Sequence, residues 1–109
     1  MSFKVLVIPP FNRQVKALSK KYPNLKSDLR QFAEGLVQNP TLGIPIGKDC
    51  YKIRMAISDK RKGKSGGARI ITCVRVFRET IYLLAIYDKS MQEDISKTEI
   101  ENLIGLISA

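Results

Sequence analysis

The strongest constraint on the fold lies between residues 51 and 87, where three segments with the spacing of β-strands follow one another closely. In the first, apolar residues at 51, 53 and 55 alternate with Lys52 and Arg54, so one face is apolar and the other cationic. The second, residues 69–76, also alternates. The third, Ile81 to Tyr87, is a nearly continuous apolar run, which is typical of a central strand. A tight turn near Arg78 separates the last two, and we therefore expect an antiparallel hairpin.

Residues 3–40 have the patterns of a short strand and two helices. β-branched residues predict the strand over 3–8, which Pro9 and Pro10 end. Apolar residues then recur with helical spacing over 11–18 and again over 25–37. Pro23 separates the two helices, and the second should end before Pro40. We expect these two helices to form a helical hairpin.

The C-terminal part has the signal of one more helix. Ser96 and Glu99 have capping-box spacing, and an apolar stripe follows over residues 100–107. The predicted order is therefore β-α-α-β-β-β-α, in a small α+β single domain that spans residues 1–109. We expect a mixed or antiparallel sheet of about four strands, with the helical hairpin packed on one face. The other face should remain partly open and basic.

The positive charge is concentrated in the middle of the chain. The net charge is +9, and residues 48–78 hold ten Lys or Arg against two Asp. Five of the ten residues from Lys60 to Arg69 are cationic, and three are glycines. This concentration favours a polyanionic partner, most simply nucleic acid. The alternative is a solvated face that only aids solubility.

The absence of histidine excludes several kinds of active site. The chain has no His, which excludes a Ser-His-Asp triad, a Cys-His dyad, a His-based zinc hydrolase and a two-histidine ribonuclease. The basic segment has no paired carboxylates, so we predict no two-metal nuclease site. Gly63-Lys64-Ser65 is similar to the end of a P-loop, but Ser58 stands where that loop requires glycine. We therefore predict neither a metal nor a cofactor.

The remaining sequence signals indicate an intracellular protein. Cys50 and Cys73 lack metal-ligand spacing, and we interpret them as two reduced, partly buried thiols of a cytosolic protein. The apolar run at residues 5–8 is too short for a signal peptide. Because no run approaches the length of a membrane span, we expect a cytoplasmic protein without a membrane partner.

Cleavage of RNA is possible without histidine or metal, because the 2′-hydroxyl is an internal nucleophile. A lysine crowded by other cations can transfer protons nearer neutral pH, and an arginine can clamp the phosphate with two parallel hydrogen bonds. The candidate side chains come from three adjacent predicted strands and could meet on the open face of the sheet: Lys52, Arg54, Arg69, Tyr87 and Lys89. A purely structural basic face would carry the same residues.

Three motifs resemble those of one family. They are Asp49-Cys50-Tyr51-Lys52-Ile53-Arg54, Gly63-Lys64-Ser65-Gly66-Gly67-Ala68-Arg69-Ile70-Ile71, and Ile81-Tyr82-Leu83-Leu84-Ala85-Ile86-Tyr87-Asp88-Lys89. Together they make the chain similar to the RelE/HigB toxins of bacterial type II toxin–antitoxin modules, in the RelE/ParE superfamily. The similarity spans the chain from about Phe3 to Leu106.

The resemblance implies a ribosome-dependent, metal-independent mRNA endoribonuclease that stops translation and is neutralised by a cognate antitoxin. Lys52 and Arg54 would act in proton transfer and phosphate contact, and Lys52 is the better base because arginine stays charged. Arg69 would stabilise the transition state. Lys89 matches the family's basic position after the last strand, and Tyr87 would stack on a base, with a packed aromatic as the alternative. The residues expected to hold ribosomal or messenger phosphates are Lys60, Arg61, Lys62, Lys64 and Arg75.

Two other functions remain open. A ParE-like inhibitor of DNA gyrase would not need the basic residues that cut RNA, and Lys52, Arg54 and Arg69 argue against it. A non-catalytic nucleic-acid-binding module would bind RNA without cleaving it. In each toxin case, the antitoxin should carry an acidic segment, because it must cover the basic region.

Overall fold

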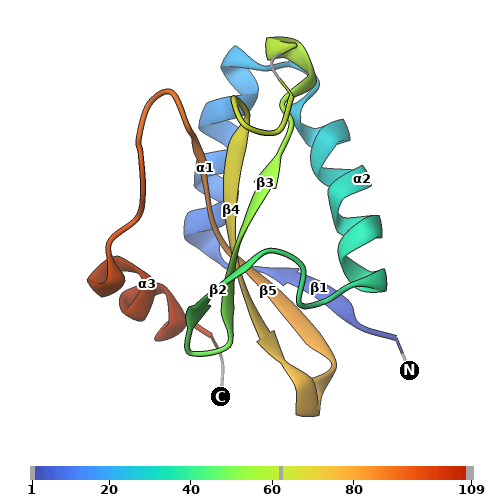
Figure 1. Ribbon diagram of the computed structural model, residues 1–109, viewed down its shortest axis with the longest axis vertical. Helices are drawn as coiled ribbons and strands as arrows, with labels where there is room; N and C mark the ends of the chain where they lie inside the picture. The colour runs from blue at the N-terminus through green and yellow to red at the C-terminus, as the bar shows by residue number, and fades with distance from the viewer. Residues whose placement is uncertain (1, 62, 108–109) are drawn as a thin grey trace.

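The computed structural model describes residues 2–61 and 63–107, which form a five-stranded sheet with helices packed against it (Figure 1). The elements, in chain order, are β1 (Lys4–Val7), α1 (Pro9–Lys21), α2 (Leu25–Gln38), β2 (Ile44–Gly47), β3 (Cys50–Met55), β4 (Ala68–Arg75), β5 (Thr80–Asp88) and α3 (Lys97–Ile104). Short 3-10 turns, Ser58–Lys60 and Val76–Arg78, follow β3 and β4. The strand order is β1-β5-β4-β3-β2, with β1 parallel to β5 and every other pair antiparallel.

The central hairpin is the one that the sequence predicted. All of β5 is buried, and β4 is buried except at Arg75, because these two strands have a neighbour on each side. The turn between them is a 3-10 turn that ends at Glu79 in the left-handed conformation, with φ of 48°. The α+β class and the order of the other predicted elements are also confirmed.

The sheet has five strands, whereas the sequence indicated about four. The additional strand is the edge strand β2, which was not predicted. Its four residues include Pro45 and Gly47, which mask the strand pattern. Proline is tolerated there because an edge strand leaves one row of its backbone unpaired. β2 pairs only with the first half of β3, up to Lys52.

The helices lie on the sheet as two separate groups. The helices α1 and α2 pack together and α1 covers β5, as expected for the predicted helical hairpin. The short helix α3 lies apart from them, after a long connection (Figure 1). Its predicted cap is present, since Ser96 Oγ accepts a hydrogen bond from the Glu99 amide at 3.1 Å. Among the described residues, no helix is long and apolar enough to cross a membrane.

Gly67 lets the loop after β3 approach the sheet closely. It is buried, and a Cβ atom there would overlap the Met55 carbonyl oxygen and come within 3.0 Å of the Ala56 Cα. Close packing against the backbone after β3 is therefore the reason that position 67 requires glycine.

We expect Gly67→Ala to lower the free energy of unfolding by about 1–3 kcal/mol, as overpacking of a filled interior does. Gly35 is the matched control, because it is exposed in α2 and a Cβ there would have no neighbour within 4 Å. Gly35→Ala should raise the free energy of unfolding by roughly 0.5–1 kcal/mol through helix propensity. Urea unfolding of both variants measures the difference, and equal effects would contradict this account of Gly67.

Candidate nucleic-acid interface

Three of the predicted site residues form a row across the sheet. Arg69 on β4 is directly opposite Arg54 on β3 and directly opposite Tyr87 on β5. Opposing residues on one face of an antiparallel pair have Cβ atoms about 4.5–5.5 Å apart. Lys52 lies two residues before Arg54 and therefore on the same face. The sheet thus brings four predicted residues from three strands into one neighbourhood.

The Arg69 guanidinium is held by backbone carbonyl groups. Its side chain is nearly buried, with the residue 7% exposed. It donates hydrogen bonds to the carbonyl oxygens of Lys64 at 3.1 Å and Ser65 at 3.0 Å, and to that of Ala68 at 3.3 Å. The same donors could bind phosphate oxygens, because both kinds of oxygen accept in a similar geometry. A phosphate would have to replace the loop carbonyls.

Asp94 connects Lys52 and Tyr87. Its Oδ1 accepts from Lys52 Nζ at 3.3 Å and lies 3.5 Å from the Tyr87 hydroxyl. A hydrogen bond from the Ile95 amide and the Lys52 ammonium lower the pKa of Asp94, so it is ionised and stabilises the lysine charge. Asp94 lies in the segment between β5 and α3 and was not among the site residues predicted from the sequence. No local pattern connects it with position 52.

Tyr87 is buried in this arrangement. Its residue is 7% exposed, and burial together with the Asp94 charge raises the pKa of its phenol to about 12. The phenol therefore stays protonated near neutral pH. A ring that is this covered favours the packed-aromatic alternative over base stacking.

Arg54 and Lys52 face different hollows. Arg54 and Lys64 line a groove of about 580 Å³ between α2 and β3, whereas Lys52 lines a hollow of about 370 Å³ between β2 and α3. Within residues 2–61 and 63–107, the exposed Arg54 side chain makes no hydrogen bond or ion pair. Arg54 is therefore available to an anion in the groove, while Lys52 is partly neutralised by Asp94.

Lys89 lies at the margin of this region. Its amide donates to the Gly67 carbonyl at 3.1 Å, and its ammonium donates to the Glu93 carbonyl at 3.2 Å. These bonds place it between the start of β4 and the segment that carries Asp94. A lysine there could turn toward the row only by leaving the Glu93 carbonyl.

The cations of the basic loop divide into two kinds. Arg61 and Lys64 are exposed, and their charges are available to phosphates. The ammonium of Lys60 instead forms an ion pair at 2.8 Å with Asp88, and its side chain is only 9% exposed. The interpretation of Lys60 as a phosphate contact therefore does not fit its position. Lys62 lies outside the described residues.

Asp88 is the centre of a buried polar network. Besides Lys60, it accepts from the Tyr22 hydroxyl at 2.5 Å and from the amide and hydroxyl of Ser90 at 2.9 and 2.8 Å. Burial would raise the pKa of Asp88, but the bonds from Lys60, Tyr22 and Ser90 outweigh it and hold that pKa well below its usual range. The network fastens the basic loop to the end of β5. Asp59 adds a second attachment, since it accepts from the amide and side chain of Asn24 in the turn between α1 and α2.

Arg75 does not belong to this region. The basic loop and the β4–β5 turn lie at opposite ends of the sheet (Figure 1). At about 3.3 Å per residue, the positions of Arg69 and Arg75 are roughly 20 Å apart along β4. Arg75 donates a hydrogen bond to Cys73 Sγ at 2.9 Å, so it contacts a cysteine of β4 and not the basic loop.

Among the described residues, no three His, Cys, Asp or Glu side chains come together as a metal site would require.

No model of a known protein family matches the sequence. Among the solved structures that match this chain are two that share its fold. One is a mutant of the E. coli toxin RelE in the free state, with a TM-score of 0.62 and 14% sequence identity over 99% of this chain and 100% of that chain. The other is the isolated E. coli RelE toxin, with a TM-score of 0.55 and 15% identity over 98% of this chain and 100% of that chain. The chain therefore has a RelE-like fold along nearly its whole length.

Proposed function

We propose that this protein is the toxin of a toxin–antitoxin pair and that it cuts mRNA on the translating ribosome. The observation that carries the proposal is the row of Arg54, Arg69 and Tyr87 with Lys52 beside it, on a RelE-like fold. A phosphate that replaced the loop carbonyls would meet two arginines from adjacent strands. Such a clamp suits the charge that develops on a phosphorane.

The proposed reaction uses the RNA 2′-hydroxyl as nucleophile. Lys52, released from Asp94 and deprotonated to its neutral amine, takes the 2′-hydroxyl proton, and the 2′-oxygen forms a bond to the adjacent phosphorus. The bond from phosphorus to the 5′-oxygen then breaks, and Lys89 supplies the proton to that leaving oxygen. The products are a 2′,3′-cyclic phosphate and a free 5′-hydroxyl. Arg69 and Arg54 hold the phosphate oxygens throughout.

The test in cells is induction of the protein followed by primer extension on translated messages. We expect new 5′ ends within coding regions, in phase with codons, and a fall in protein synthesis. The matched control is Lys16→Gln, which removes an exposed lysine from α1 and should cut as well as the unchanged protein. Intact messages with normal translation would reject the proposal, and a DNA-damage response with intact messages would indicate gyrase inhibition.

A second candidate is a non-catalytic RNA-binding module. It is favoured by the hydrogen bonds that occupy Arg69 and by the ion pair of Lys52 with Asp94, since both catalytic candidates already have protein partners. In that case the protein would bind ribosomes or RNA, and the message would stay intact. The primer-extension assay distinguishes the two candidates.

The proposed partners follow from the charge. An antitoxin that covers the groove of Arg54 and Lys64 should present an acidic segment to it. The ribosome and its message would supply phosphates to the same cations, and the proposed site of action is therefore the cytoplasm.

The exposed loop cations should account for part of the salt dependence of RNA binding. Each of Arg61→Gln and Lys64→Gln should make the negative slope of log K against log salt shallower by about 0.7, the value for one phosphate of a single strand. Lys60→Gln should leave the slope of the folded protein nearly unchanged, because its charge is paired with Asp88. Fluorescence titrations of a short RNA at several salt concentrations measure the slopes. Equal slopes for all three variants would contradict this division of the loop.

A further inference from the structure

Cys50 and Cys73 are paired directly across β3 and β4. The Val74 amide donates to the Asp49 carbonyl at 2.9 Å, and this bond flanks the cysteine pair on one side. Hydrogen-bonded and non-hydrogen-bonded pairs alternate along an antiparallel ladder, and the bond makes Asp49 and Val74 a hydrogen-bonded pair. The cysteines next to them are therefore a non-hydrogen-bonded pair, in which opposing Cα atoms are about 4.5 Å apart and the side chains come closest. That separation lies within the range that a disulfide spans, roughly 4.4–6.8 Å.

The two sulfur atoms also converge on a single oxygen atom. The Lys48 carbonyl oxygen lies 3.5 Å from Cys50 Sγ and 3.8 Å from Cys73 Sγ. Both residues are free thiols and both are buried, 1% and 0% exposed. The pair is therefore arranged for a bond between the two sulfurs without a shift of either strand.

The two thiols are chemically unequal. Arg75 donates to Cys73 Sγ at 2.9 Å, and a guanidinium in this position stabilises a thiolate. The hydrogen bond from Cys50, together with the Arg75 charge, lowers the pKa of Cys73 to about 7, although burial and Asp49 oppose this. The same hydrogen bond raises the pKa of Cys50. Cys73 is therefore the nucleophile, and Cys50 keeps its proton.

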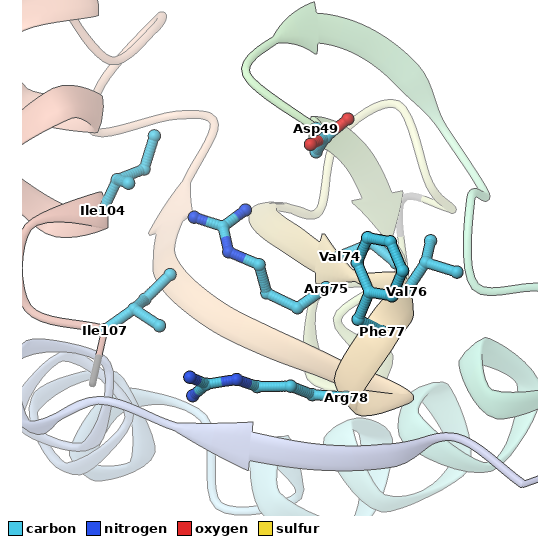
Figure 2. Close-up of a pocket in the computed structure, with 8 residues that line it drawn as sticks. All are labelled: Asp49, Val74, Arg75, Val76, Phe77, Arg78, Ile104 and Ile107. Carbon is cyan, nitrogen blue, oxygen red and sulfur yellow. The ribbon is translucent and has the colours of Figure 1, made fainter. Parts of the chain in front are cut away.

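A hollow lies next to the pair; neither cysteine lines it, but Arg75, which donates to Cys73 Sγ, does. It has a volume of about 580 Å³ and is lined by Asp49, Val74 and Arg75 on the sheet side and by Ile104 and Ile107 near α3. Figure 2 shows the Arg75 side chain extending from β4 toward Ile104 across this space. Helix α3 has only eight residues, and a brief opening of so short an element would admit a small reagent.

We propose that Cys73 is a peroxide-reactive modification site and that Cys50 resolves it to an intramolecular disulfide. The Cys73 thiolate attacks one peroxide oxygen, the O–O bond breaks, and hydroxide leaves and takes a proton to become water. The resulting sulfenic acid then reacts with the Cys50 thiol, which forms the S–S bond and releases a second water. The two thiols lose two electrons, and the peroxide gains them. This inference does not depend on the proposed function.

The test is treatment of the whole protein with hydrogen peroxide at pH 7, followed by mass spectrometry without reduction. We expect a product lighter by two hydrogens, a linked pair of peptides that contain Cys50 and Cys73, and reversal by dithiothreitol. In Cys50→Ala, dimedone should trap a sulfenic acid on Cys73. In Cys73→Ala, Cys50 should remain unmodified.

The role of Arg75 has its own measurement. Arg75→Gln should slow disulfide formation on the order of tenfold at pH 7, because less of Cys73 is then thiolate. Arg13→Gln is the matched control, since Arg13 is exposed on α1, and its rate should not change. The proposal is overturned if both thiols stay reduced while free glutathione is oxidised, or if the linked peptides join two molecules. An unchanged rate in Arg75→Gln would overturn the assignment of Arg75.

Discussion

Replacing Arg69 with alanine is expected to reduce the proposed ribosome-dependent cleavage by about 30- to 1,000-fold, which corresponds to roughly 2–4 kcal/mol of lost transition-state stabilisation. The expectation follows from the position of Arg69 in the row, between Arg54 and Tyr87. Its fork can bind two phosphate oxygens at once, and it is the central residue of the row, with Arg54 on one side and Tyr87 on the other. Single-turnover cleavage of a message on purified ribosomes measures the effect.

A second effect of this substitution must be separated from the first. Arg69 also donates to the carbonyls of Lys64 and Ser65, so its loss removes one attachment of the basic loop. Circular dichroism and urea unfolding should show that the variant stays folded. Arg13→Ala, which removes an exposed arginine from α1, should cleave normally. Near-normal cleavage by folded Arg69→Ala would remove Arg69 from the proposed site.

Replacing Asp88 with alanine is expected to lower the free energy of unfolding by about 3–5 kcal/mol, because it leaves a buried cation without its partner. The Asp88 side chain is fully buried, and that of Lys60 is only 9% exposed. Tyr22→Phe, which removes one donor to Asp88, should cost less, about 1–3 kcal/mol. Urea unfolding at pH 7 compares the two variants. A loss below about 1 kcal/mol in Asp88→Ala would contradict a structural role for the network.

The Asp88 network also predicts a pH dependence. The folded protein holds the pKa of Asp88 well below its usual range, so the carboxylate contributes stability that is fully present above about pH 5. This contribution is lost as the pH falls through the unfolded value, about 3.9, toward the folded one. The stability difference between the unchanged protein and Asp88→Asn should therefore shrink between pH 5 and pH 3. A constant difference over that range would contradict the assignment.

The sequence predicted the elements whose periodicity is strong. Alternation along β3 and β4, the apolar run of β5 and the cap at Ser96 each depend on neighbouring residues, and each is present. The edge strand β2 was missed because Pro45 and two flanking glycines, Gly43 and Gly47, obscure its pattern. Its strand conformation depends on pairing with β3, which is a tertiary contact.

The candidate site was predictable only in part, for a similar reason. Placing Lys52, Arg54, Arg69 and Tyr87 on one face required only strand alternation and the order of neighbouring strands. The roles of Lys60 and Asp94 depend on contacts with residues far along the chain, Asp88 for Lys60 and Lys52 for Asp94. Arg75 was grouped with the basic loop because both lie in the same cationic part of the sequence. The strand β4 between them places Arg75 at the other end of the sheet.

The most direct test of the central proposal is cleavage by the purified protein on ribosomes that hold a short, end-labelled message. The account predicts cuts within the codon being read, fragments that end in a 2′,3′-cyclic phosphate, and no cuts in the same message without ribosomes. Loss of the cuts in folded Arg69→Ala would connect the activity to the basic row. An intact message on programmed ribosomes, at protein concentrations that saturate binding, would contradict the account.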